Sequence, residues 1–174
     1  DAFDLALWNA LTPKEHEEIK RGKRIDAIPF DPERRRNSVL YETGQGRTVI
    51  VRGAPEEILL RSRDISAYER KELMQWVARA GREGNRVIAV AQKAFAPGRK
   101  YTLYEEQDLE FAGLIAFRDE LKPTARETID RAKRLGVTVK IITGDSQEVS
   151  GAVGHAVGLI ASPDMVVTGK MLDA

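Results

Sequence analysis

The sequence predicts an α/β protein, in which an α+β part built on an antiparallel sheet flanked by helices precedes a partial parallel βαβ unit of the doubly wound kind. Two observations predict it. β-branched and aromatic runs at 39–41 and 48–51 flank the glycine-containing turn Thr43-Gly44-Gln45-Gly46, which is typical of a hairpin. Beyond residue 110 the pattern changes to strand, helix, strand, which indicates a right-handed parallel unit.

The elements of the first part follow from periodicity and capping signals. Leu5, Leu7, Trp8 and Leu11 share a helical face that stops before Thr12-Pro13. The charged stretch 15–24 contains Gly22 and is expected to be a surface turn. The later elements are a strand at 24–28, a short helix from Pro55, a helix opened by a Ser66–Glu69 capping box and ending near Gly81, and a strand at 86–91.

The second part begins after a polar segment at 93–110, which is either a long loop or a boundary between domains. We place the boundary near Leu109, so that the domains are 1–110 and 111–174. The expected elements are a strand at 111–117, a helix from Pro123 to Gly136, a strand at 137–142 and a helix at about 146–157.

Composition excludes several classes of protein. Lys and Arg number 28 against 27 Asp and Glu, so a nucleic-acid partner held by bulk charge is not expected. The absence of cysteine excludes disulfides and thiolate metal sites and favours a cytosolic compartment. No apolar run approaches the roughly 20 residues that span a bilayer. The first residues lack a methionine and a signal-like core, so we expect a piece of a longer protein.

The hairpin brings two stretches to one end of the sheet. They are the run from Pro29 to Val39, with Phe30 and three consecutive arginines at 34–36, and the stretch in which Arg52 precedes Gly53. One ring and four cations on one surface suit a flat base stacked on Phe30 with phosphates drawn to the arginines. The alternative is a solvated basic loop beside a buried phenylalanine.

A second candidate site is Thr143-Gly144-Asp145, which follows the apolar run at 137–142. A hydroxyl and a free backbone amide can bind phosphoryl oxygens, while a carboxylate lies near the accompanying magnesium ion. The alternative is a simple strand-to-helix turn with Asp145 near the helix cap.

The run from Pro29 to Val39 and the stretch around Arg52-Gly53 resemble the nucleotide-binding (N) domain of P-type ATPases. These are ion pumps that pass through an aspartyl phosphate. The family has Phe, a charged run, Ser and Val, then Lys-Gly-Ala-Pro-Glu, where this chain has Arg52 in place of the lysine. The resemblance implies that Asp4 approaches the adenine amino group and that Arg86, in Gly84-Asn85-Arg86, meets the phosphates together with Arg35. Without the resemblance, Asp4 would be read as an acid that stabilises the start of a helix, and Arg86 as a solvated arginine at the start of a strand.

The segment Asp119-Glu120-Leu121-Lys122-Pro123 and the Thr-Gly-Asp tripeptide resemble the phosphorylation (P) domain of the same family, which is Rossmann-like and haloacid-dehalogenase-like. Asp119 then belongs to a hinge, although Glu120 and Leu121 replace the family's two prolines. Thr143, Gly144 and Asp145 would support the phosphoryl group. The family's nucleophile motif, Asp-Lys-Thr-Gly-Thr, and its magnesium motif, Gly-Asp-Gly-x-Asn-Asp, do not occur in the chain.

The resemblance implies an ATP-binding cytoplasmic fragment of an integral, bacterial or archaeal plasma-membrane pump, closest to the magnesium-transporting and proton-pumping branch. It implies ATP, with Mg²⁺ in the intact protein, as cofactors, and no catalysis by the fragment alone. The implied partners are ATP or ADP, the actuator, the rest of the P domain and the transmembrane helices.

Two rival functions stay open. A soluble haloacid-dehalogenase-type phosphatase would share the βαβ core, but its Asp-x-Asp nucleophile pair does not occur. A non-enzymatic interaction module would present Arg34-Arg35-Arg36 to an acidic partner. Titration with nucleotide separates the second rival, because such a module should be indifferent to ATP.

Overall fold

The structure is a computed structural model that describes residues 2–96 and 98–172. The chain folds into two compact units, one formed by Asp1–Lys71 and Ile88–Ile115 and the other by Glu72–Val87 and Ala116–Ala174. The domain limits 1–110 and 111–174 stay a prediction.

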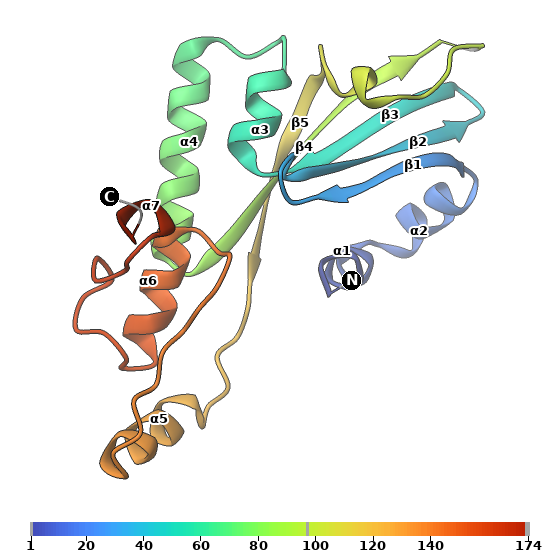
Figure 1. Ribbon diagram of the computed structural model, residues 1–174. Helices are drawn as coiled ribbons and strands as arrows, with labels where there is room; N and C mark the ends of the chain where they lie inside the picture. Colours follow the sequence, from blue (N-terminus) through green and yellow to red (C-terminus); the bar gives the residue numbers. More distant parts are fainter. Residues whose placement is uncertain (1, 97, 173–174) are drawn as a thin grey trace. The chain divides into compact units, whose positions relative to one another are not determined.

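The first unit is built on a five-stranded sheet in the order β1-β2-β3-β4-β5 (Figure 1). The ladders from β1 to β4 are antiparallel. The predicted antiparallel sheet with flanking helices is therefore confirmed, as is the hairpin, in which Thr43 pairs with Gly46 across the turn. The strands are β1 (Lys23–Asp31), β2 (Arg36–Thr43), β3 (Gly46–Gly53), β4 (Asn85–Phe95) and β5 (Glu110–Arg118).

Strand register gives the sheet two different faces. On the core face, Leu40 pairs with Val49 and Val51 pairs with Ala91, and all four are buried. Because side chains alternate along a strand, Asn37, Val39 and Tyr41 with their partners on β3 lie on the opposite face, which is half-buried. The core face carries the main apolar cluster, which comprises Leu40, Val49, Val51, Ile58, Ala89, Ala91, Phe95 and Leu109.

Helices cover both faces. On the core face, α3 (Pro55–Arg61) contributes the buried Ile58, and the 3₁₀ helix η1 (Leu103–Glu106) lies within the polar segment that was predicted as a loop or boundary. On the half-buried face, α1 (Ala2–Ala10) and α2 (Pro13–Lys20) contact the sheet. The contacts are an ion pair between Asp4 and Arg52 and a hydrogen bond from the Tyr41 hydroxyl to the Ile19 carbonyl.

Helix α2 corrects one prediction, because the stretch 15–24 was expected to be a surface turn. Thr12 and Glu15 form a capping box in which each side chain binds the other residue's backbone amide, and Pro13 occupies the first turn. These interactions satisfy amides that a helix start leaves unpaired. The capping signal in Thr12-Pro13-Lys14-Glu15 was therefore stronger than the charge pattern.

The remaining helices agree with the sequence, except a short helix at 169–172 that was not predicted. Ser66 and Glu69 form the expected capping box before α4 (Ala67–Arg82). In the second unit, Ser146 caps α6 (Gln147–Ala156) by accepting the Val149 amide. The last helices are α5 (Ala125–Arg134) and α7 (Gly169–Leu172). Within the described ranges, no helix is long and apolar enough to cross a membrane.

The predicted parallel unit is wrong in two respects. Its first expected strand, 111–117, is β5 and joins the edge of the sheet beside β4. Its second, 137–142, has no strand conformation, and Ile142 is 98% exposed. A buried parallel strand needs neighbouring strands and covered faces, and among the described residues nothing pairs with this segment.

Candidate functional site

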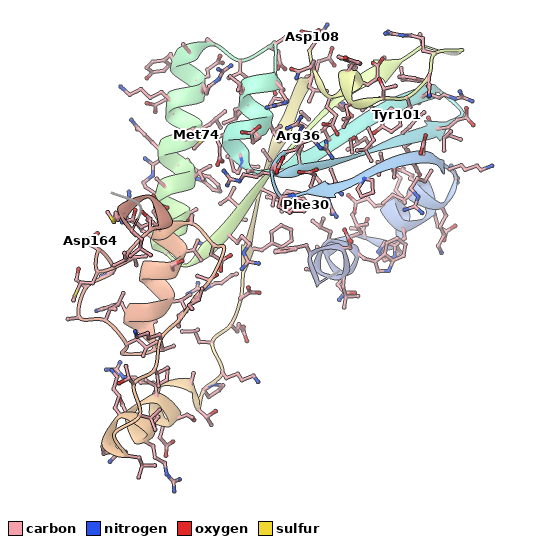
Figure 2. All side chains as sticks on the ribbon, viewed as in Figure 1. Phe30, Arg36, Met74, Tyr101, Asp108 and Asp164 are labelled. Carbon is pink, nitrogen blue, oxygen red and sulfur yellow. The ribbon has the colours of Figure 1, made fainter. Side chains whose placement is uncertain are left out.

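Phe30 lies at the end of the sheet where β1 meets β2. Asn37 and Arg52 lie on the half-buried face of this end of the sheet, but the β1–β2 ladder is irregular between Ile28 and Asp31, so register alone does not place Phe30. Figure 2 shows Phe30 on the side of the sheet where α1 lies. The ring is 61% exposed, which contradicts the alternative of a buried phenylalanine and leaves an aromatic surface for a ligand.

Arg52 and Asp4, which lies on α1, form an ion pair on the same side of the sheet. The Arg52 guanidinium donates from Nη1 to Oδ1 of Asp4 at 2.5 Å and from Nε to Oδ1 of Asn37 at 3.2 Å. The hydrogen bond from Arg52 holds the pKa of the Asp4 carboxyl below its ordinary value. Asp4 was predicted to contact the base and Arg52 the phosphates. In the structure the two side chains form an ion pair with each other.

Arg35 occupies the β1–β2 turn at the same end of the sheet. Its φ of 53° is left-handed, which is uncommon outside glycine. The Arg35 carbonyl accepts the Ala54 amide at 2.9 Å, and the exposed guanidinium pairs with Glu56 at the start of α3. A Cβ on Gly53 would lie 2.4 Å from the Arg35 carbonyl oxygen, so the turn requires a residue without a side chain at 53.

The three consecutive arginines do not share one surface, which corrects the prediction. Arg36 is 6% exposed and points to the core face, where its Nε donates to Oε2 of Glu106 at 2.7 Å. Arg34 donates from Nη1 to both oxygens of the same carboxylate, at 2.9 and 2.7 Å. Only Arg35 of the three is exposed. Alternation along β2 and the buried acid account for the difference.

Glu106, on η1, is fully buried and is the centre of this polar cluster. Its Oε1 accepts the Ser38 hydroxyl at 2.7 Å, and Ser38 accepts the Tyr101 hydroxyl at 2.6 Å. Burial raises the pKa of the Glu106 carboxyl, but the hydrogen bonds from Ser38, Arg34 and Arg36 outweigh burial and hold the pKa below its ordinary value.

Sequence reasoning missed Glu106. It lies in the polar segment 93–110, and its partner Arg36 is 70 positions away along the chain. Nothing in the local sequence pattern distinguishes this glutamate from its neighbour Glu105 or from the acids on the surface. The one signal was the unusual density of cations at 34–36, since a buried arginine needs an anionic partner.

The second unit contains the other predicted residues. Arg86, at the start of β4, pairs with Asp145 through Nη2 and Oδ1 at 2.6 Å. The Thr143 hydroxyl accepts the Asp145 amide at 3.1 Å, and Gly144 between them is exposed. Asp119 directly follows β5 and is exposed. The structure thus joins Arg86 to the Thr-Gly-Asp turn, while Asp4, Phe30, Arg35, Arg52 and Gly53 belong to the first unit.

No metal centre is evident in the described part of the chain, since no three His, Cys, Asp or Glu side chains there are arranged to hold an ion. The groups at the first site are the Phe30 ring and the Arg35 and Arg52 guanidiniums, which pair with the carboxylates of Glu56 and Asp4 respectively. Such a set can stack a planar group and attract anionic oxygens.

Comparison with known proteins identifies the family. Residues 1–124 match the model of the P-type ATPase cytoplasmic domain N. The chain belongs to this family.

Similar proteins include cation-transporting ATPases of several bacteria. A magnesium-transporting ATPase of Salmonella typhimurium is 39% identical over 160 residues, which cover 84% of this chain and 17% of the relative. One from Escherichia coli K12 is 38% identical over 81% of the chain and 17% of its own length. A calcium-transporting ATPase of Lactococcus lactis is 30% identical over 89% and 19%. The chain thus spans less than a fifth of each relative.

Proposed function

We propose that this chain binds ATP in a P-type ATPase that couples ATP hydrolysis, through an aspartyl phosphate, to cation transport. The observation that carries the proposal is the cluster at one end of the sheet, where the exposed Phe30 lies on the same face as the Asp4–Arg52 pair. Phe30 offers a stacking surface for adenine and Asp4 an acceptor for its amino group. Arg35 and Arg52 attract the phosphates, with Gly53 giving room at the backbone.

The second unit supports a separate role in the same reaction. Thr143, Gly144 and Asp145 would hold the transferred phosphoryl group, and Arg86, already paired with Asp145, would carry positive charge to the phosphates. Mg²⁺ accompanies ATP in the intact protein and neutralises charge on the phosphates. Asp119 would serve as a hinge. The domains 1–110 and 111–174 are retained as the N domain and part of the P domain.

Magnesium is the first candidate for the transported cation. The relatives named as magnesium-transporting are 38–39% identical, whereas those named as calcium-transporting are 28–30% identical. The partners would be ATP or ADP and the other domains of the pump, namely the actuator, the rest of the P domain and the membrane helices. The interaction-module alternative is disfavoured because Glu106 engages two of the three arginines that would meet an acidic partner.

The test is calorimetric titration with ATP, ADP and AMP, with and without a magnesium chelator. Stacking of a base on an aromatic ring is worth about 1–3 kcal/mol, so Phe30→Ala should weaken binding roughly five- to a hundredfold. Tyr68→Ala, which removes an aromatic ring exposed on α4, is the matched control and should bind like wild type. Chelation should change little. Equal affinity in wild type and Phe30→Ala would remove Phe30 from the site.

The chain alone should not be phosphorylated, because the nucleophile motif Asp-Lys-Thr-Gly-Thr does not occur in it. Incubation with radiolabelled ATP and Mg²⁺, followed by acid quench, checks this. A hydroxylamine-sensitive phosphoprotein would overturn this part of the proposal.

A further inference from the structure

We propose that Glu106 is a positioning residue for nucleotide binding, which holds the β1–β2 turn so that Phe30 and Arg35 are presented to the ligand. The inference rests on the proposed function, because Phe30 and Arg35 are taken as ligand residues. Glu106 itself is fully buried and does not contact the ligand. It acts through Arg34 and Arg36, the two residues that flank Arg35 in the chain.

The turn itself is held in a conformation of high backbone energy. Arg35 has a φ of 53°, a region that costs a non-glycine residue about 1 kcal/mol or more. Within the turn, the Asp31 carboxylate accepts the Glu33 amide at 2.8 Å and the Arg34 amide at 3.0 Å. The Asp31 carbonyl accepts the Arg35 amide at 2.7 Å. All of these hydrogen bonds join residues 31–35, so they shape the turn but do not attach it to another segment.

Glu106 supplies an anchor from a distant segment. Its carboxylate holds the Arg34 guanidinium, whose Nη2 also donates to the Pro29 carbonyl at 2.9 Å. Pro29 directly precedes Phe30, so this arginine connects the buried acid to the backbone on which the aromatic ring is carried. The anchor therefore fixes the entry to the turn.

The exit from the turn is held by the same acid. Arg36 donates from Nε to Glu106 at 2.7 Å and from Nη1 to the Arg34 carbonyl at 2.9 Å, which closes a ring of contacts around Arg35. With both flanking residues fixed, the Arg35 carbonyl accepts the Ala54 amide, and the exposed side chain pairs with Glu56. Glu106 thus positions the Arg35 backbone through its two neighbours in the chain.

Glu105 provides a control within the same helix. It is also buried, but its carboxylate pairs with Lys93 at 3.0 Å and with Arg99 at 3.1 Å. Neither partner belongs to the turn. Replacing either glutamate by glutamine removes one buried charge from η1, but only Glu106→Gln releases the turn.

The experiment measures the affinity of the whole 174-residue chain for ATP and for adenosine in wild type, Glu106→Gln and Glu105→Gln. Denaturant unfolding of each protein gives the folded fraction, for which the affinities are corrected. Because small displacements of positioned groups cost up to about a hundredfold, Glu106→Gln should lose roughly ten- to a hundredfold in affinity for both ligands. Glu105→Gln should bind like wild type.

A double-mutant cycle separates positioning from general stability. If Glu106 acts by positioning the aromatic ring of Phe30, Glu106→Gln should weaken binding much less in a Phe30→Ala background than in wild type. A loss of folded protein alone would give the same factor in both backgrounds. Should Glu106→Gln fail to fold, Arg34→Met replaces it in the cycle, because this change cuts the connection to Pro29 and leaves Arg36 on Glu106.

The outcomes distinguish the two proposals. Wild-type protein that binds neither ligand would overturn the proposed function and this inference together. Nucleotide binding that depends on Phe30 but is weakened equally by Glu105→Gln and Glu106→Gln would overturn this inference alone. An additive cycle would do the same.

Discussion

Gly53 lies so close to Arg35 that a Cβ at position 53 would approach the Arg35 carbonyl oxygen to 2.4 Å and the Arg36 Cβ to 2.6 Å. Both distances are far below van der Waals contact, and the first is to a backbone atom that is held by the Ala54 amide. The glycine therefore sets how closely β3 passes the β1–β2 turn. Glycine is required at position 53 because a side chain would clash with the turn, and not because of its backbone conformation, which is not left-handed.

Gly53→Ala should consequently destabilise the protein by about 1–3 kcal/mol, which is typical of overpacking. It should also weaken nucleotide binding by displacing the Arg35 backbone. Gly44→Ala is the control, because a Cβ at 44, in the hairpin turn, meets nothing within 4 Å. Urea unfolding checks the prediction, and equal stability of the two variants would contradict it.

The buried pair of Glu106 with Arg36 predicts a dependence of stability on pH. The pKa of Glu106 is held below its ordinary value of 4.5, so ionisation favours the folded state. The stabilisation is fully present above the pKa of the unfolded chain and is lost as the pH falls through the lower pKa of the folded chain. The groups facing the carboxylate are Arg34, Arg36, Ser38 and Tyr101, with Glu57 beyond Arg36.

Glu106→Gln should lower the free energy of unfolding at neutral pH by about 3–5 kcal/mol, because two arginines lose their buried counter-charge. The difference between variant and wild type should begin to shrink as the pH falls below 4.5, where the carboxyl of the unfolded chain takes up a proton. It should be lost below the lower pKa of the folded chain, where the folded carboxyl is also neutral. Urea unfolding as a function of pH measures this. A difference that stayed constant down to the acid limit would show that ionisation of Glu106 does not stabilise the fold.

The sequence predicted the parts of the fold that local signals determine. The glycine turn at 43–46 and the Ser66–Glu69 capping box need no distant partner, and the hairpin pairs Asn37 with Arg52 at one end of the sheet. The predictions that were wrong concern features that depend on residues distant in the sequence. The apolar segment 137–142 has strand character, but a strand forms only beside another strand. Arg36 looked like a surface cation because its anionic partner, Glu106, lies 70 positions away in the sequence.

Helix α2 is the exception, since a local signal was present and was outweighed by the charge of the segment. Thr12→Ala removes the side chain that accepts the Glu15 amide and should cost about 1 kcal/mol. Loss of amide-exchange protection should be confined to α2, residues 13–20. Unchanged protection there would mean that packing on Tyr41, and not the cap, holds the helix.

The ion pair of Asp4 with Arg52 leads to a prediction about the choice of base. A carboxylate accepts a hydrogen bond from the 6-amino group of adenine but faces an acceptor oxygen in guanine, whereas an asparagine amide can donate to that oxygen. Asp4→Asn should therefore reduce the preference for adenosine over guanosine. Hydrogen bonds to charged groups contribute about 1.5–3 kcal/mol, so the preference should fall roughly ten- to a hundredfold.

Nucleosides are the ligands for this test because they carry no phosphate. Asp4→Asn also takes the counter-charge from Arg52, and a phosphate-bearing ligand would gain affinity from the released cation. Glu17→Gln is the control, since it removes an exposed acid on α2 whose ion pair is with Lys20 in the same helix. Titration calorimetry or ligand-observed NMR gives the two affinities. An adenosine-to-guanosine ratio that is the same in wild type, Asp4→Asn and Glu17→Gln would show that Asp4 holds Arg52 in place without reading the base.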